Sequence, residues 1–207
     1  MNDKGVCEAM DRHLQYCTID LLHHPANPVI CRECSRRGPT CCRYGVGDNE
    51  LIAPLSEEEW RRLRTIAPWT SHGGHVARER NSALFIREMQ KLFPDHATAV
   101  ETTFPLGATH LRLAENSLGQ CTCLGPQGCL LPSAARPLFC QIYPFWFIDG
   151  HLFAVGDPRC LALQTLDSST TLLEAFGTRH DHLWEIYRQL CRAWGLGSPR
   201  PTESAYD

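Results

Sequence analysis

The sequence has no excess of basic residues and no long apolar run, and these two absences exclude broad classes of protein. Its 207 residues include 20 Lys and Arg against 23 Asp and Glu, so the formal net charge is -3. The basic residues are scattered rather than gathered into a stripe, which argues against nucleic-acid binding. Apolar runs such as Phe145–Ile148 fall far below the ~20 residues needed to span a bilayer. We therefore expect neither a nucleic-acid partner nor a membrane span.

Two further features are missing. The N-terminal sequence MNDKGVCEAM carries acidic residues and lacks the apolar stretch of a secretory signal, so we expect a cytoplasmic protein. No glycine-rich strand-to-helix turn of the dinucleotide-binding kind is present. With 43% hydrophobic residues, the chain has enough apolar material for one domain, or for one domain with a helical appendage.

Cysteine, in contrast, is abundant. The chain contains 12 cysteines, and in a reducing compartment these are not expected to form disulfides. Metal thiolates or catalytic thiols are the remaining explanations. An even count also fits a disulfide-stapled secreted domain, but such domains are usually shorter and carry a signal.

Eight of the cysteines fall in two clusters. The segment Cys121–Cys140 reads CTCLGPQGCLLPSAARPLFC, and the segment Cys31–Cys42 reads CRECSRRGPTCC. A C-x2-C gap allows one tight turn to direct two sulfurs at a single ion. If the adjacent Cys41 and Cys42 lie on an extended segment, their side chains point to opposite faces and serve two ions or two corners of a cluster. We predict that the fold brings both clusters to one metal site.

The later cluster also contains turn and helix signals. A Gly-Pro-Gln-Gly turn between Cys123 and Cys129 would let the backbone fold tightly around an ion. Pro137 is expected to begin a short helix that places Cys140 in its first turn, where the helix dipole favours a thiolate. Downstream, Cys160 is a further candidate ligand.

Local patterns predict the remaining elements. Ser56 and Glu59 form a capping box at the start of a helix that ends near Ile66. Further helical patterns cover 10–22, 80–92 and 168–194, with a possible division at Gly177. Strands are expected over 49–55 and 104–115, a loop over 70–80, and a β-hairpin around Asp149-Gly150.

These elements predict an α+β fold, a small and irregular cysteine-rich domain organised by metal. It would contain short strands, several helices and a C-terminal helical segment. The expected organisation is an N-terminal extension (1–30), a metal-chelating domain (31–165), a helical segment packed on it (166–195) and a disordered tail (196–207).

The combined motifs resemble the YkgJ-type CxxC…CC family of small bacterial zinc- or iron-chelating domains. The matching residues are Cys31, Cys34, Cys41, Cys42, Cys123, Cys129, Arg136, Pro137, Cys140 and the Tyr143-Pro144-Phe145 segment. The gap between Cys34 and Cys41 is longer than the family usually has, Gln141 replaces a common Arg, and Cys121 is additional. The resemblance implies metal binding, with Arg136 and Pro137 beside the bound group. A flagellin lysine N-methylase carries a similar cysteine domain, which implies an enzymatic alternative.

The first functional hypothesis is a metal-binding protein. Seven or eight thiolates exceed one tetrahedral zinc, and they suit two zinc ions or one iron–sulfur cluster with spare ligands. Sulfur ligands exclude magnesium and calcium, while cysteine-only ligation and the vicinal pair favour iron–sulfur over zinc. The alternatives are a cluster-dependent redox or group-transfer enzyme and a zinc-stapled interaction module. The expected ligands are Cys31, Cys34, Cys41, Cys42, Cys123, Cys129 and Cys140.

Overall fold

The computed structural model describes residues 7–10, 14–18, 30–37, 41–42, 54–71, 74–132, 135–155, 160–165 and 172–199. Within these ranges the fold is α+β, as the sequence predicts, with helices and short antiparallel strands in small sheets. No helix in this part of the chain is long and apolar enough to cross a bilayer.

The helical elements include several very short ones. The α-helices are α1 (Ile30–Arg37), α2 (Glu57–Ile66), α3 (Ala83–Leu92), α4 (Ala97–Thr103), α5 (Leu138–Ile142), α6 (Leu161–Thr165), α7 (Leu172–Ala175) and α8 (His180–Ala193). The 3₁₀ turns are η2 (Pro68–Ser71) and η3 (Pro94–His96). The strands are β1 (Cys7–Met10), β2 (Leu14–Thr18), β3 (Pro54–Leu55), β4 (Val76–Arg80), β5 (Thr109–Leu113), β6 (Leu124–Gly125), β7 (Gly128–Cys129), β8 (Phe145–Ile148) and β9 (His151–Val155).

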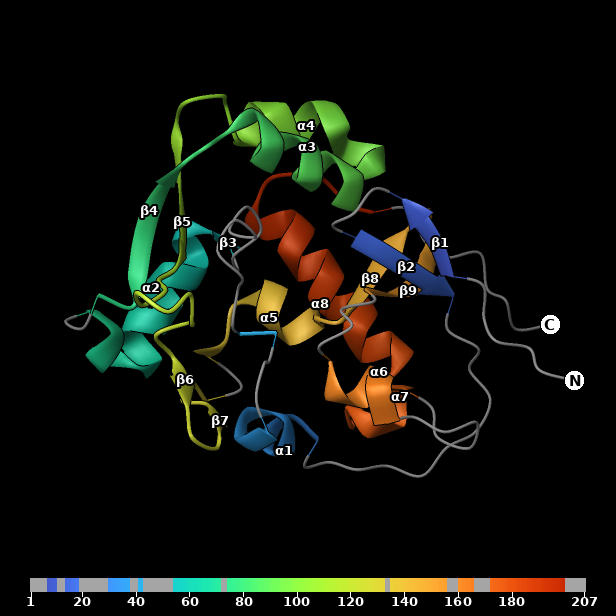
Figure 1. The fold of residues 1–207 in the computed structure, drawn as a ribbon. Coiled ribbons are helices and arrows are strands. Elements are labelled where there is room, and N and C mark those ends of the chain that lie inside the picture. The colour runs from blue at the N-terminus through green and yellow to red at the C-terminus, as the bar shows by residue number, and fades with distance from the viewer. Residues whose placement is uncertain are drawn as a thin grey trace, which may run out of the picture.

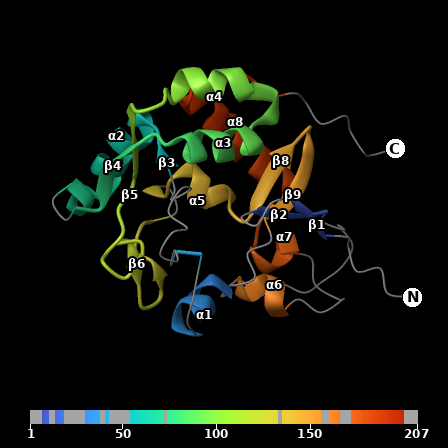
Figure 2. The same cartoon turned by 45° about the horizontal axis from the view of Figure 1, so that its top comes forward.

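Helix α8 occupies the middle of the molecule and packs against α5 and β8 (Figure 1). The sheet containing β8 and β9 lies on one side of α8, while β4, β5 and α2 lie on the other (Figures 1 and 2). Helix α1 lies below α5, where it packs against both β7 and α6. The first cysteine cluster is thereby placed between the two halves of the fold.

The larger sheet has strand order β1-β2-β9-β8, with every pair antiparallel. The predicted Asp-Gly hairpin is confirmed, since Asp149 and Gly150 adopt φ of 49° and 77° between β8 and β9, as a type I′ turn requires. The helix predicted over 10–22 is wrong for residues 14–18, which form β2 on the open edge of β9, while residues 11–13 and 19–22 lie outside the described part. Pairing with a distant strand outweighs a weak helical period.

The smaller sheet has β5 in the centre, flanked by β3 and β4. The loop predicted over 70–80 is wrong for Val76–Arg80, which pairs along its whole length with β5. The charge-rich sequence VARER gives little strand signal, so the partner strand determines its conformation. Of the strand predicted over 49–55, only Pro54–Leu55 lies within the described residues, and there it is a strand.

The predicted helix boundaries hold where capping chemistry defines them. Ser56 Oγ accepts from the Glu59 amide at 3.1 Å, and Glu59 Oε2 accepts from the Ser56 amide at 2.8 Å, so the capping box is confirmed. Gly177 adopts φ of 60° between α7 and α8 and divides the C-terminal helical pattern. Leu196, at the start of the predicted tail, is buried, and residues 200–207 lie outside the described part.

The buried side chains of the described residues form two clusters. The aromatic core surrounds α8 and includes Phe85, Met89, Phe93, Phe104, Phe145, Trp146, Phe147, Leu183, Tyr187, Leu190 and Trp194. The cysteine core lies between α2, β5 and the later cysteine cluster, and consists of Leu55, Leu63, Ala67, Leu111, Leu113, Cys121, Cys123, Leu131 and Ala135.

Candidate metal centre

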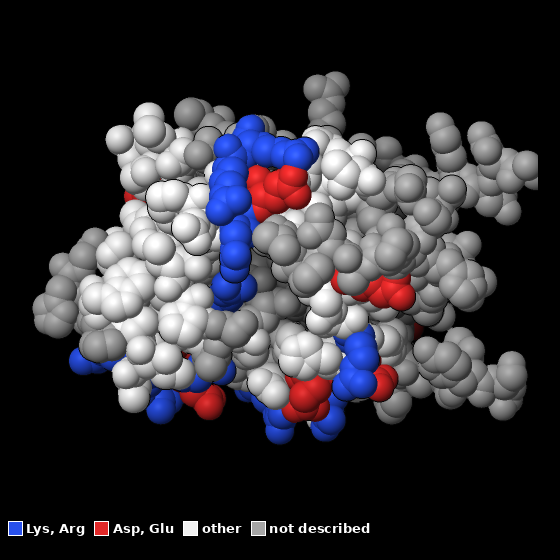
Figure 3. Space-filling view, turned by 90° about the horizontal axis from the view of Figure 1, so that it is seen from below, with Lys and Arg blue, Asp and Glu red and all other residues white. Residues whose placement is uncertain are grey.

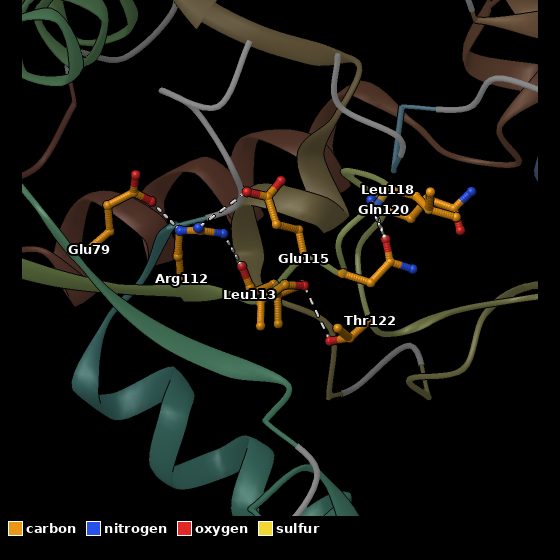
Figure 4. Close-up of polar contacts among 9 residues, drawn as sticks. Glu79, Arg112, Leu113, Glu115, Leu118, Gln120 and Thr122 are labelled. Atoms are coloured by element: carbon orange, nitrogen blue, oxygen red, sulfur yellow. Dashed lines mark hydrogen bonds and ion pairs between the residues drawn. The ribbon is translucent and has the colours of Figure 1, made fainter. Parts of the chain in front are cut away.

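An ion-pair network anchors the strand that leads to the later cysteine cluster. Arg112 on β5 lies between two carboxylates, pairing with Glu79 of β4 and, at 3.6 Å, with Glu115 (Figure 4). Its Nη1 also donates to the Leu113 carbonyl at 2.9 Å. Only 12% of the Arg112 side chain is exposed, so solvent screens these pairs less than it would at the open surface.

The loop after β5 is closed by one asparagine. Asn116 Oδ1 accepts from the amides of Leu118 at 2.9 Å and Gln120 at 3.1 Å, which is the side-chain turn that Asn favours. Thr122 Oγ1 then donates to the Ala114 carbonyl, one residue after β5, at 3.2 Å (Figure 4). Cys121, between these contacts, is therefore held close to the β5 strand.

The two cysteine clusters meet at this loop. The Cys121 amide donates to the Cys42 carbonyl at 2.8 Å. On the other side, α1 packs against β7, and Ser35 Oγ lies 3.4 Å from the Pro126 carbonyl. Segments that are far apart in the sequence are thus joined by hydrogen bonds at two places, one between backbone groups and one from a side chain.

Five thiols form a back set around the cysteine core: Cys42, Cys121, Cys123, Cys129 and Cys140. The charges of these thiols interact with one another, and each of the last two interacts with Cys42 and Cys121. Burial raises the pKa of Cys129, and it raises that of Cys140 well above the usual range. Further thiolates in the same small volume add to this effect, since like charges disfavour ionisation.

Two thiol pairs have opposite pKa shifts. A hydrogen bond from Cys41 lowers the pKa of Cys42, and the same bond raises that of Cys41 well above its usual value. In the second pair, a hydrogen bond from the Cys123 side chain lowers the pKa of Cys121 and raises that of Cys123. Cys42 and Cys121 are therefore the thiols most readily ionised.

Four thiols form a front set: Cys31, Cys34, Cys41 and Cys160. Burial, then the neighbouring Cys160, Cys34 and Cys42, raise the pKa of Cys31 to about 11. Cys41 interacts with Cys31 and Cys160 as well. Cys31 and Cys34 lie three residues apart on α1, so a helical turn rather than a loop places them on one side of the chain.

Arg136 is the cation that lies among these thiols. Its positive charge opposes the pKa rise of Cys31 and Cys129 and contributes to the low pKa of Cys42. Arg136 Nε donates to the Leu131 carbonyl at 3.2 Å. The Arg136 carbonyl in turn accepts from Gln141 Nε2 at 2.7 Å. Gln141 therefore holds the Arg136 backbone.

Helix α5 positions Cys140 with the help of a buried carboxylate. Pro137 is buried at the N-cap, and the Leu138 amide donates to Glu59 Oε1 at 2.7 Å. Cys140 lies in the first turn, as predicted, but its pKa is not lowered. Burial is the first cause of the rise and the Glu59 carboxylate adds to it, so these effects exceed the dipole of a five-residue helix.

The basic residues of α1 lie on the surface. Arg32, Arg36 and Arg37 are exposed, and Arg37 pairs with Glu33 one turn earlier. Figure 3 views the side of the molecule on which α1 lies, and a narrow line of basic side chains crosses it beside acidic ones. Exposed pairs of this kind contribute little to stability.

The thiols are close but are not arranged as metal ligands. Among the described residues, no three His, Cys, Asp or Glu side chains are grouped so that they could hold an ion. Hydrogen bonds join Cys41 to Cys42 and Cys121 to Cys123, and in each pair one thiol donates its proton to the other. A metal ion would have to replace these protons.

Sequence reasoning left Cys121 without a place and gave Cys160 only as a further candidate ligand. In the structure, Cys121 interacts with thiols of the back set and Cys160 with thiols of the front set. Proximity in the fold, rather than spacing, identifies both. Cys191 lies apart from the two sets, fully buried in the aromatic core, where its thiol is hydrogen-bonded with Tyr187. No family model, curated protein or solved structure matches the chain.

Proposed function

We propose that this protein binds an iron–sulfur cluster or zinc through its two cysteine clusters. The supporting observation is that the clusters converge: the Cys121 amide bonds the Cys42 carbonyl, and thiols of both clusters shift one another's pKa. The ligands would come from Cys31, Cys34, Cys41, Cys42, Cys121, Cys123, Cys129, Cys140 and Cys160.

The chemistry of these donors restricts the metal. All nine are thiols, which suit zinc, iron–sulfur clusters and copper(I) and do not suit magnesium or calcium. Nine exceed the four ligands of one zinc, so the chain would hold two zinc ions or a cluster with spare thiols. Cysteine-only ligation and the vicinal pair favour the cluster. A bound cluster would supply electron transfer, and zinc would supply folding energy.

In this proposal, the Arg136 guanidinium offsets the negative charge of the metal–thiolate group. Four thiolates on a divalent ion leave a net charge of minus two, and a buried excess of charge is unfavourable. The Arg136 guanidinium interacts with thiols of both sets, so it would offset the charge of whichever group is bound. Pro137 would keep α5, and with it Cys140, in place beside that cation.

Anaerobic purification followed by visible absorbance, elemental analysis and labile-sulfide assay tests the proposal. Iron with sulfide and a brown colour supports the cluster, and stoichiometric zinc without colour supports zinc. The matched variants are Cys129→Ser, expected to lower metal content, and Cys191→Ala, expected to leave it unchanged. A chain that retains no metal, and takes up neither zinc nor iron with sulfide on reconstitution, contradicts the proposal.

A further inference from the structure

A small pocket lies at the edge of the aromatic core. Three segments that are distant in the sequence form it: the 3₁₀ turn η3, the turn of the β8–β9 hairpin and helix α8. Its lining residues are Pro94, Asp95, His96, Phe147, Asp149, Gly150, Trp184, Tyr187 and Pro199. None of the candidate thiols is among them, so the pocket is a site separate from the candidate metal centre.

One wall of the pocket is aromatic. The rings of Phe147 and Trp184 lie 4.8 Å apart in an edge-to-face arrangement, and the Tyr187 ring lies 5.4 Å from the first and 5.9 Å from the second. Phe147 and Tyr187 are buried, whereas Trp184 is half-buried. Aromatic faces attract a cation that lies within about 6 Å of the ring centre. This wall therefore favours a positively charged ligand.

Two carboxylates also line the pocket. Asp95 belongs to η3 and Asp149 to the hairpin turn, and both are exposed residues. Within the described part of the chain, neither carboxylate has a hydrogen-bond or ion-pair partner, and no Lys or Arg lines the pocket. Burial, then Cys191, raise the pKa of the Tyr187 phenol, and the charges of both carboxylates add to this rise. Both carboxylates therefore lie close to the aromatic wall.

One imidazole nitrogen in the pocket needs a hydrogen-bond partner. The Nε2 atom of His96 is buried, and no group of the described residues bonds to it. A buried polar atom without a partner is costly. In the tautomer that carries its proton on Nδ1, the Nε2 atom is an acceptor. Together with the two carboxylates, this acceptor favours a ligand that is both cationic and a hydrogen-bond donor.

The size of the pocket selects among such cations. Its open volume is about 270 Å³ including the mouth, but its interior has room for only one group of about the size of a water molecule. A primary ammonium group is of this size and has three N–H donors, whereas guanidinium and trimethylammonium groups are larger. A metal ion is disfavoured, because no three His, Cys, Asp or Glu side chains of the described residues are grouped to coordinate one.

We propose that this pocket binds a primary ammonium group, carried either by a small amine or by a lysine side chain of a partner. The carboxylates of Asp95 and Asp149 and the Nε2 atom of His96 accept its N–H bonds, and the aromatic wall faces its charge. The site is independent of the proposed metal centre, so the failure of one leaves the other in place.

Heteronuclear NMR on the full chain tests the proposal. Titration with n-butylammonium is expected to shift the Trp184 indole N–H and the backbone amides of Asp95, His96, Asp149 and Gly150. Two comparison compounds are expected to bind at least about tenfold more weakly: n-butanol, which lacks the charge, and butyltrimethylammonium, whose head group exceeds the interior of the pocket. The absence of a saturable shift with n-butylammonium, or an equal affinity for either comparison compound, overturns the proposal.

A matched pair of variants locates the site. Asp149→Asn removes one carboxylate and preserves the turn, because Asn tolerates the positive φ of this position. It is expected to weaken n-butylammonium binding by about tenfold. Asp181→Asn removes the same charge from an exposed position on α8 outside the pocket, and it should leave the affinity unchanged. Equal effects of the two variants would show unspecific attraction to negative charge and would contradict a site.

The two sources of the ammonium group are distinguished by a third titration. The probe is the peptide acetyl-Ala-Lys-Ala-amide, whose backbone can add contacts at the mouth of the pocket. Binding at least about tenfold tighter than that of n-butylammonium identifies a lysine side chain as the ligand. Binding that is no tighter than that of n-butylammonium identifies a small amine.

Discussion

The aromatic core and the cysteine core differ in what holds them together. In the aromatic core, Phe93 is fully buried and its ring lies 5.2 Å from that of Trp146, 5.9 Å from Tyr187 and 5.8 Å from Trp194. Such rings bury large areas and gain further from their mutual geometry. The cysteine core has no such ring among its buried residues. One half of the molecule is thus stabilised by apolar burial, and we infer that bound metal completes the other half.

Two elements connect the cores and show how one affects the other. Helix α5 buries Ile142 in the aromatic core and packs Cys140 against the cysteine core. Strand β5 buries Leu111 and Leu113 in the cysteine core, while its His110 ring stacks on Phe85. Each core can therefore be perturbed separately, and the effect on the other can be measured.

Metal removal should have the largest effect on stability, and it should distinguish the cysteine core from the aromatic core most clearly. Structural zinc in small domains binds with about 10–16 kcal/mol of apparent free energy, most of which would be lost from the cysteine core. Hydrogen exchange after chelation is expected to lose protection in α2 and β5 and to retain it in α8. Adding magnesium serves as the control and should restore nothing. Equal loss in α2 and α8 would contradict the contrast between the cores.

The next largest loss of unfolding free energy is expected from truncating one buried side chain in each core. Phe93→Ala is expected to cost about 3–5 kcal/mol, because it leaves a cavity among three aromatic rings. Leu63→Ala, at a position 1% exposed in the cysteine core, is expected to cost about 2–5 kcal/mol. Denaturant unfolding with and without chelator is the measurement. The Phe93→Ala penalty should not depend on metal, whereas Leu63→Ala should also weaken metal binding.

Elements defined by adjacent residues could be predicted from the sequence. The Ser56–Glu59 capping box, the Asp149-Gly150 turn and the helix division at Gly177 each depend on chemistry within a few residues. The missed elements depend on distant partners. Strand β4 pairs with β5 and strand β2 pairs with β9 across long stretches of sequence. Helix α4 was also missed, because it is short and lies between Pro94 and Pro105.

The environment of the candidate thiols could not be predicted from their spacing. Spacing identified seven of the thiols, but the place of Cys160 depends on how α6 and α1 pack together. The pKa direction of Cys140 was wrong, because burial and the Glu59 carboxylate are properties of the folded chain. A common metal site for both clusters stays a prediction.

The pH dependence of stability should show a smaller effect at the junction of the cores. His110 is 8% exposed, its Nδ1 lies 2.8 Å from Asn81 Oδ1, and burial, then Arg112, lower its pKa from 6.5 to about 4. The unfolded chain therefore binds a proton that the folded chain does not. The contribution of His110 to the free energy of unfolding is fully present above pH 6.5 and is lost as the pH falls toward 4. The total loss is up to roughly 3 kcal/mol.

Comparison with His110→Gln isolates this contribution from that of the carboxylates. The difference in unfolding free energy between the two proteins is expected to change between pH 6.5 and 4 and to be constant above pH 7. A difference that stays constant over the whole range would show that His110 titrates normally in the folded chain.

The smallest effects should come from two helix caps, one on each core. Ser82 Oγ accepts from the Phe85 amide at 2.9 Å at the start of α3, and Ser56 Oγ caps α2 within its capping box. Loss of either cap is expected to cost about 1 kcal/mol. Ser82→Ala should lower the free energy of unfolding equally with and without metal. Ser56→Ala should lower it only while the cysteine core is closed, because chelation has already opened α2. Caps that respond identically to chelation would mean that α2 remains folded without metal and that apolar burial holds both cores.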